Sequence, residues 1–158
     1  MATFTARKTS EATVPHDRSA VWEVLVDPDL VARMTPMVSR IRASGDQWHW
    51  QLVTIPLLGR SFDLGFTEAM TFHPQHRIDF RHAPAGTERA GTDGSYALAD
   101  ADGGATRLAI DLAVTVDLPF PRLARPAVTA SMQTVLGAMG IGFARSIERH
   151  LAGPHGSP

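Results

Sequence analysis

Apolar residues occupy every second position along several neighbouring stretches in the middle of the chain. The clearest stretch runs from Gly65 to Phe72, together with the residues just before it, and its alternating apolar residues are Phe62, Leu64, Phe66, Met70 and Phe72. The same alternation is found in two further groups, Trp48, Trp50 and Leu52, and Leu108, Ile110, Leu112, Val114 and Val116. Because side chains alternate between the two faces of a strand, each stretch predicts a strand with one buried face. Between Met37 and Val116 we expect six strands in an antiparallel sheet with one covered face.

The chain on either side of these strands predicts one more strand and three helices. Thr3 to Val14 alternates more weakly and is expected to form a first strand. Asp17 is a suitable N-cap for a short helix with an apolar stripe at helical spacing, and Leu30 to Met34 is expected to form a second short helix before Pro36.

A long amphipathic helix is predicted at the C-terminal end, from about Leu123 to Leu151. Its apolar residues recur at steps of three and four: Val128, Met132, Val135, Leu136, Met139, Phe143, Ile147 and Leu151. Pro126 is tolerated because it falls in the first turn. The expected fold is therefore α+β, with a seven-stranded antiparallel sheet wrapped around a long C-terminal helix and two short N-terminal helices. One helix does not fill the space inside a curved sheet, so we expect a cavity between them.

Length, composition and charge narrow the class of protein. The 158 residues, 44% of them hydrophobic and 20% charged, are typical of one globular domain. We expect that domain to span residues 1–152, with a disordered tail at 153–158. A net charge of -1 gives no reason to expect nucleic acid as a partner, and the lack of cysteine excludes disulfides. With no basic and apolar leader and no run of about 18 apolar residues, we expect a cytoplasmic protein without a membrane span.

The connections between the strands alternate in character. Three are polar, and the three between them are apolar or contain proline: residues 55–59, 83–86 and 118–121. Because successive turns of an antiparallel sheet lie at opposite ends, one end is expected to be polar and the other apolar. An exposed apolar rim often marks an entrance or a contact surface. We expect a cavity entrance at this end, formed by Leu57, Leu58 and Phe120, and transient membrane contact there is compatible with it.

The order strand, two short helices, six strands and long helix resembles the helix-grip fold of the START-related and polyketide-cyclase superfamily (SRPBCC). The residues most similar to it are Val14 to Asp27 (VPHDRSAVWEVLVD), Gly94 to Leu98, Gly104 to Leu108 and the closing helix. The resemblance covers about Phe4 to Leu151. It implies a protein that binds lipids, quinones, steroids or polyketides, or one that cyclises or dehydrates them. No catalytic motif of that superfamily maps onto this chain, so no catalytic residue follows from the resemblance.

Three residues are candidates for proton chemistry. Strict alternation points Glu68 inward among apolar neighbours, where burial would raise its pKa. Tyr96, the only tyrosine, could donate a hydrogen bond to a carbonyl or enolate from a cavity wall. His82 follows Ile78 and Phe80 in register and would be the natural base if it also faces inward. Each has a structural alternative: an outward bulge or core ion pair for Glu68, an ordinary wall residue for Tyr96, and a half-exposed strand end for His82.

The remaining candidates line a cavity rather than perform chemistry. The predicted ligand-binding set is Trp48, Trp50, Phe66, Glu68, Met70, Tyr96, Met132, Met139 and Phe143. We expect no cofactor, and no metal site, since His73 and His76 share a turn without a third ligand. The Gly137–Gly142 segment has the letters of a dinucleotide loop but lies inside a helix, so its glycines are expected to thin that helix.

Three classes of function remain open at this point. The first is a carrier or sequestering protein that binds a hydrophobic small molecule (a lipid, quinone or polyketide-like compound) between the sheet and the C-terminal helix. The alternative is a polyketide aromatase/cyclase or dehydratase acting in the same cavity, which requires at least two of Glu68, His82 and Tyr96 to converge there. An interaction module with an apolar rim is a third class.

Overall fold

A computed structural model describes residues 2–153 of the chain. Its elements, in chain order, are β1 (Ala2–Val14), α1 (Arg18–Leu25), α2 (Pro28–Met34), β2 (Val38–Ser44), β3 (Gln47–Leu52), β4 (Ile55–Leu57), β5 (Arg60–Phe62), β6 (Gly65–His73), β7 (Arg77–His82), β8 (Ala90–Asp100), η1 (Asp102–Gly104), β9 (Thr106–Leu118), η2 (Arg122–Ala124) and α3 (Arg125–Ala152). Apart from Gly153, the tail predicted to be disordered lies outside the described residues.

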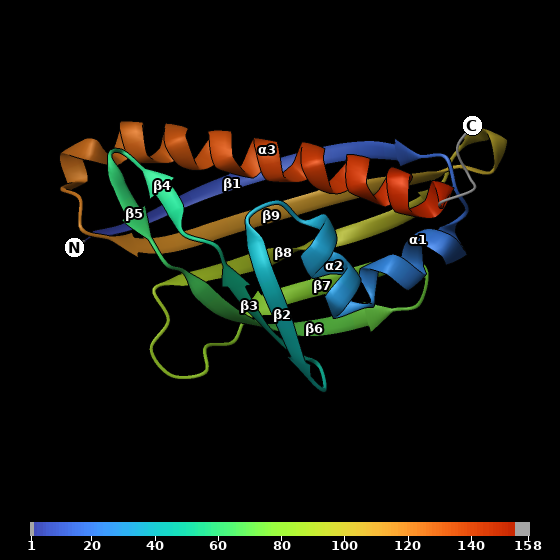
Figure 1. Ribbon diagram of the computed structural model, residues 1–158, viewed down its shortest axis with the longest axis horizontal. Coiled ribbons are helices and arrows are strands. Elements are labelled where there is room, and N and C mark those ends of the chain that lie inside the picture. The colour runs from blue at the N-terminus through green and yellow to red at the C-terminus, as the bar shows by residue number, and fades with distance from the viewer. Residues whose placement is uncertain (1, 154–158) are drawn as a thin grey trace.

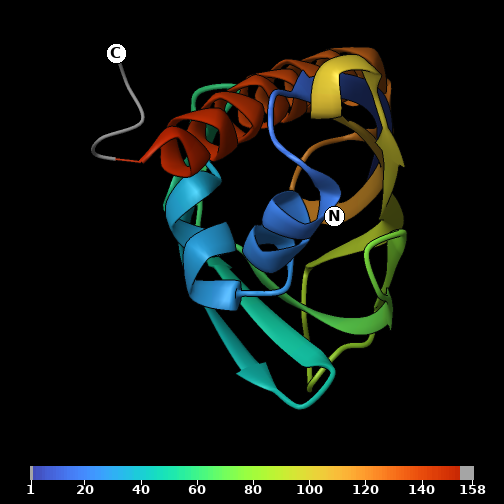
Figure 2. The same cartoon turned by 90° about the vertical axis from the view of Figure 1, so that its right-hand side faces the viewer.

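Seven strands form one antiparallel sheet in the order β1-β9-β8-β7-β6-β3-β2. The sheet curves around α3, which runs lengthwise beside the edge strand β1 (Figure 1). Seen from the side, α1 and α2 lie across one end of the curl (Figure 2). The expected helix-grip architecture is therefore confirmed.

Aspartates begin both short helices, as the sequence predicts for the first. The Asp17 carboxylate accepts a hydrogen bond from the Ala20 amide at 2.8 Å. Asp27 does the same for α2, accepting from the Asp29 and Leu30 amides, and Pro28 occupies the first turn. The second helix thus begins at Pro28, two residues before the predicted Leu30.

One local prediction needs correction. The apolar alternation from Phe62 to Phe72 was taken as one inward row leading into β6, but Phe62 belongs to a separate two-stranded hairpin, β4–β5. The hairpin turns at Leu58 and Gly59, which both have positive φ (49° and 77°), as a two-residue hairpin turn requires. Periodicity continued across the break because both segments face the same interior.

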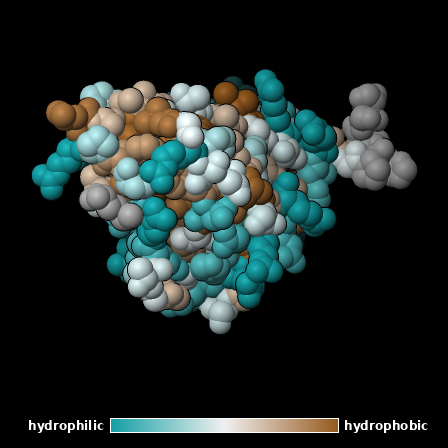
Figure 3. All heavy atoms as spheres, turned by 60° about the vertical axis from the view of Figure 1, so that its left-hand side comes forward, coloured by the Kyte–Doolittle hydropathy of each residue, from teal (hydrophilic) through white to brown (hydrophobic). Residues whose placement is uncertain are grey.

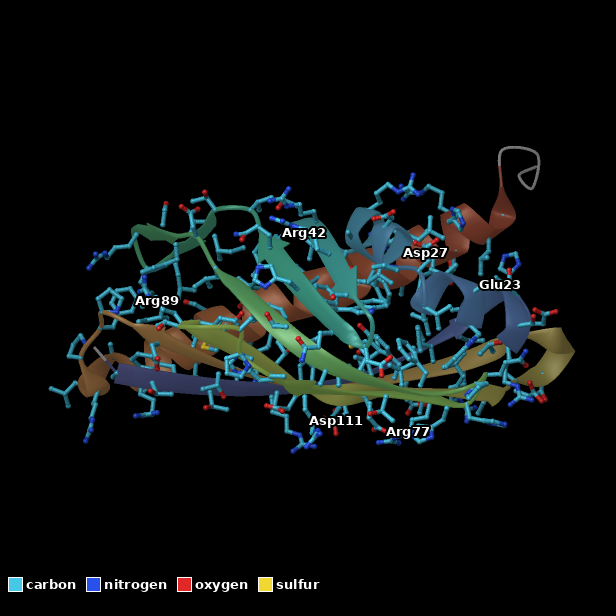
Figure 4. All side chains as sticks on the ribbon, turned by 90° about the horizontal axis from the view of Figure 1, so that it is seen from below. Glu23, Asp27, Arg42, Arg77, Arg89 and Asp111 are labelled. Atoms are coloured by element: carbon cyan, nitrogen blue, oxygen red, sulfur yellow. The ribbon has the colours of Figure 1, made fainter. Side chains whose placement is uncertain are left out.

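The two faces of the sheet differ in composition. The inner face packs a core whose fully buried side chains include Phe4, Val14, Ile78, Leu108 and Leu118, with Val128 and Ile147 of α3. The outer face carries ion pairs such as Arg7–Asp111 at 2.6 Å and Arg77–Asp79 at 2.8 Å. Figure 4 shows Arg77 and Asp111 pointing away from the strands on this outer side. Alternation along the strands thus separates an apolar interior from a charged exterior.

The glycines of α3 serve two purposes. A Cβ at Gly142 would come within 2.4 Å of Pro36 Cγ, so glycine lets α3 pack closely on the connection between α2 and β2. Gly137 and Gly140 instead face Lys8 and Ser10 of β1, whose nearest atoms would lie 3.9 Å from an added Cβ. The expectation of a thinned helix is confirmed by close packing at Gly142, while Gly137 and Gly140 place no side chain of their own against Lys8 and Ser10.

One helical segment within residues 2–153, Arg122–Ala152, is long and apolar enough to cross a membrane by length and composition alone. Polar residues and glycines interrupt this run in the sequence. Only 17% of its apolar window is buried. Here the apolar side of the helix, with Val128, Met132, Phe143 and Ile147, is buried against the rest of the fold.

Candidate functional site

A cavity of about 180 Å³ lies between the sheet and α3. Its walls come from β1, β3 to β6, β8, β9 and α3, and most of the side chains are aliphatic or aromatic. The last strand contributes five of them: Ile110, Leu112, Val114, Val116 and Leu118. The predicted hollow interior is therefore present.

Six of the nine residues predicted to line the cavity do so: Trp50, Phe66, Tyr96, Met132, Met139 and Phe143. Aromatic rings stack along its walls, with Trp50 and Phe66 at 5.8 Å between centroids and Tyr96 and Phe143 at 6.2 Å. The residues of the lining thus come from strands and helix alike, as the two periodicities predicted.

Trp48, Glu68 and Met70 face the same side of the sheet but lie outside the lining. Trp48 packs on Phe72, which also meets Trp22 of α1, with centroid distances of 6.0 and 6.3 Å. This half of the inner face is filled because α1 packs onto it. The alternation of side chains identifies which residues of a strand face inward. It does not identify the position along the strand at which the cavity ends.

Of the three residues predicted to form the cavity entrance, one lies in the cavity wall instead. Leu57 lines the cavity and is buried, whereas Leu58 is 44% exposed at the hairpin turn. Phe120 packs edge-on against Phe62 of the same hairpin, at 5.9 Å between centroids. Leu123, next to this end, is 94% exposed. Viewed from this side, hydrophobic atoms gather in the upper part of the surface, toward α3 (Figure 3). The apolar end exists, and its use as an entrance stays a prediction.

A small polar cluster adjoins the cavity. Glu68 is 3% exposed, and its Oε2 accepts a hydrogen bond from the hydroxyl of Thr92, a lining residue. Its Oε1 has no hydrogen-bond partner among the described residues, and neither has Nε1 of the neighbouring Trp50. Buried polar atoms without partners are rare in folded proteins, and the Trp50 N–H lies close enough to favour the ionised form of Glu68.

Burial governs the protonation of this cluster. It raises the pKa of Glu68 to about 8, against the opposing effect of the nearby Thr92 and Trp50 donors. Burial, and then the proximity of Glu68, also raises the pKa of Tyr96. At neutral pH the glutamic acid and the phenol are therefore both protonated. Together with the Trp50 N–H, they offer hydrogen-bond donors to an oxygen acceptor.

His82 does not face the cavity, and the expectation that it does is wrong. In the register β6–β7 it stands opposite Glu68, but its ring lies where a Cβ of Gly91 would point, 2.3 Å from Nδ1. Gly91 alternates with the inward residues Ala90 and Thr92, so this is the outer face. The ring turns outward because its Nε2 hydrogen-bonds Glu88 Oε1 at 2.9 Å.

Glu88 is the centre of a second cluster on that outer face. Its side chain is 5% exposed and accepts hydrogen bonds from the Thr67 amide at 2.9 Å and the Thr67 hydroxyl at 2.7 Å. His49 joins through Thr67 Oγ1 at 2.9 Å. Burial raises the pKa of Glu88, but the hydrogen bonds from Thr67, His82 and the Ala85 amide outweigh it, and the pKa is lowered. This cluster fastens the β7–β8 connection to the sheet.

Besides further apolar residues, the lining contains four polar residues that the predicted set lacks: Thr35, Thr92, Lys8 and Ser10. A signal for the last two was present. The inward positions of β1 are Phe4, Ala6, Lys8, Ser10, Ala12 and Val14, so two polar residues interrupt an otherwise apolar row. For Thr92 no such signal exists, since threonine is common in strands.

Comparison with solved structures shows the fold. The Zhui aromatase/cyclase from Streptomyces sp. R1128 superposes with a TM-score of 0.70 at 17% identity, over 97% of this chain and 99% of that one. A conserved protein from Geobacillus kaustophilus gives 0.71 at 14%, over 92% and 95%. A START superfamily protein from Mycobacterium smegmatis gives 0.65 at 14%, over 91% and 95%. No protein-family model and no curated protein matches the sequence. The chain has the helix-grip fold shared by START-like proteins and aromatase/cyclases.

Proposed function

We propose that this protein binds a hydrophobic small molecule in the cavity between the sheet and α3, as a carrier or sequestering protein. The observation that carries the proposal is the apolar cavity of about 180 Å³. An empty volume of this size costs about 4 kcal/mol at ~24 cal/mol per Å³. That is a large part of the stability of a typical domain, so an apolar occupant would stabilise the protein substantially.

The polar cluster indicates what else the ligand carries. Trp50 and Tyr96 line the cavity, and Glu68 lies directly behind Thr92 in the wall. Since the groups available at neutral pH are donors, the matching ligand group is a hydrogen-bond acceptor such as a carbonyl oxygen. A lipid, quinone or polyketide-like compound with such an oxygen fits this description.

The similar folds support binding of this kind. One solved relative in fold is a START superfamily protein, and others are aromatase/cyclases. The hypothesis of a cyclase or dehydratase needs two of the three candidate groups inside the cavity. Tyr96 lines it, Glu68 lies behind the lining and His82 lies on the outer face. This arrangement favours binding over catalysis.

The proposal is tested with the uncharged dye Nile red and with native mass spectrometry of the purified protein. We expect one dye molecule per chain, or a co-purified apolar compound with a carbonyl group. Val135→Trp, which adds a ring inside the cavity, should abolish dye binding. Ala138→Trp adds the same bulk on the exposed side of α3 and should not. A protein that neither binds Nile red nor retains any extractable compound would refute the proposal.

A further inference from the structure

The inner row of the edge strand β1 is interrupted at its centre. Phe4, Ala6 and Val14 of this row are buried, whereas Lys8 and Ser10, which point to the same side, are exposed. An inward residue of a strand is exposed only where nothing covers it. The two side chains therefore mark a gap between β1 and α3.

Two glycines of α3 create this gap. Gly137 and Gly140 face Lys8 and Ser10, and an added Cβ would still lie 3.9 Å from the nearest atom of either. A surface groove runs along the same place, and five residues line both it and the main cavity: Lys8, Ser10, Ile110, Leu136 and Gly140. The cavity and the groove thus meet here, and we call this place the side window.

The side window carries the positive charges of Lys8 and Arg145, and neither forms an ion pair among the described residues. Lys8 is the only lysine of the chain, and the described residues include no acidic group within 4 Å of its ammonium or of the Arg145 guanidinium, which also lines the groove. The one acidic residue of the groove, Glu11, pairs with Arg107 at 3.6 Å. Arg7, which precedes Lys8 in the sequence, is by contrast paired with Asp111 on the outer face.

The floor of the groove is apolar. Ile141 is 58% exposed there, and Leu136 and Ala144 lie beside it. A cation above an apolar floor that leads into an apolar cavity matches an amphiphile: the chain is removed from water and the charged end stays at the surface. An ammonium binds an anionic oxygen group such as a carboxylate by a charge-assisted hydrogen bond, and a carboxylate is the smallest such end of a single-chain amphiphile.

We propose that the side window holds the carboxylate of a single-chain amphiphile on Lys8, while its apolar chain passes Gly140 into the cavity. This rests on the proposed function and adds an anionic end to the ligand class. It also places the charged end of the ligand at the edge of the sheet, away from the apolar end at Leu57, Leu58 and Phe120.

The test compares dodecanoate with dodecan-1-ol as competitors of Nile red. Lys8→Met should weaken dodecanoate about tenfold, because one charge-assisted hydrogen bond is lost, and leave dodecan-1-ol unchanged. Arg7→Met removes a positive charge from the same strand on its outer face and should change neither affinity. Nile red affinity itself reports that each variant is folded.

A second readout uses the single lysine. Dodecanoate should protect Lys8 from acetylation by sulfosuccinimidyl acetate, measured by mass spectrometry, and dodecan-1-ol should protect it less. Equal dodecanoate affinity in the wild type and Lys8→Met, with Nile red bound, would overturn the side window alone. A wild-type protein that neither binds Nile red nor retains any extractable compound would overturn the proposed function and this inference with it.

Discussion

Two glutamates on opposite faces of the same sheet, one fully buried and one partly buried, titrate in opposite directions. Glu68 on the inner face has one hydrogen bond and one unpartnered oxygen, and its pKa is raised to about 8. Glu88 on the outer face accepts from Thr67, His82 and the Ala85 amide, and its pKa is lowered. The adjacent residues Thr67 and Glu68 of β6 connect the two clusters.

The difference teaches that burial alone does not set the charge of a carboxyl group. Loss of hydration disfavours the ionised form in both places, more strongly at the deeper Glu68, and Glu88 has more hydrogen-bond donors. A carboxylate with its donors in place is a structural link. The inner carboxyl group lies behind Thr92 of the cavity wall and keeps one oxygen without a hydrogen-bond donor.

The largest expected effect concerns the pH dependence of stability. Between pH about 4.5 and 8 the unfolded chain has Glu68 ionised while the folded chain keeps it protonated, so folding takes up a proton. The free energy of unfolding should fall as pH rises through this window, by about 1.4 kcal/mol per pH unit and on the order of 5 kcal/mol in all. Urea unfolding of the wild type and Glu68→Gln measures it. The variant should lose this decline, and an unchanged profile would break the comparison.

Removal of the outer carboxylate is the next largest effect. Glu88→Gln leaves the Thr67 amide and the His82 ring without their charged acceptor, and should lower the free energy of unfolding at pH 7 by about 2–3 kcal/mol. Because the pKa of Glu88 is lowered, its contribution is present above the ordinary pKa and is lost as pH falls through the folded value. The difference between variant and wild type should therefore shrink in acid, and a difference that persists there would contradict the assignment.

The threonine that serves each glutamate gives a smaller, matched pair. Thr67→Val removes a hydrogen bond to an ionised group and should cost about 1.5–2 kcal/mol at pH 7. Thr92→Val removes one to a protonated group and should cost about 1 kcal/mol at pH 5. Chemical denaturation at each pH provides the values. If Thr67→Val at pH 7 and Thr92→Val at pH 5 lowered the free energy of unfolding by equal amounts, the two carboxyl groups would carry the same charge.

The smallest expected effect is that of Tyr96→Phe. Its hydroxyl faces the cavity cluster rather than holding the fold together, so stability should change by less than about 1 kcal/mol. Affinity for an apolar ligand with a carbonyl group should nevertheless fall several-fold. Thermal unfolding and ligand titration separate the two, and a large loss of stability would assign Tyr96 to the core instead.

The sequence was sufficient for the architecture because alternation and helical spacing each describe a face. It predicted Trp50, Tyr96 and Phe143 on the cavity wall for the same reason. Trp48 and Met70 could not be separated from them, since the place where α1 packs depends on contacts between distant segments.

His82 was misplaced for a different physical reason. At the end of a strand, alternation no longer fixes the face on which a side chain lies. The hydrogen bond with the Glu88 carboxylate turns the His82 ring outward. The hairpin β4–β5 was missed because its residues continue the pattern of β6. Lys8 and Ser10, in contrast, interrupt the apolar row of β1 in the sequence itself, and this signal was not used.

Carboxyl ¹³C NMR titration of the labelled protein measures both glutamates in one experiment and tests the comparison most directly. Glu68 should titrate with a midpoint of about 8 and Glu88 below its ordinary value, in the same sample. A Glu68 carboxyl that is already ionised at pH 6 would contradict a protonated donor beside the cavity.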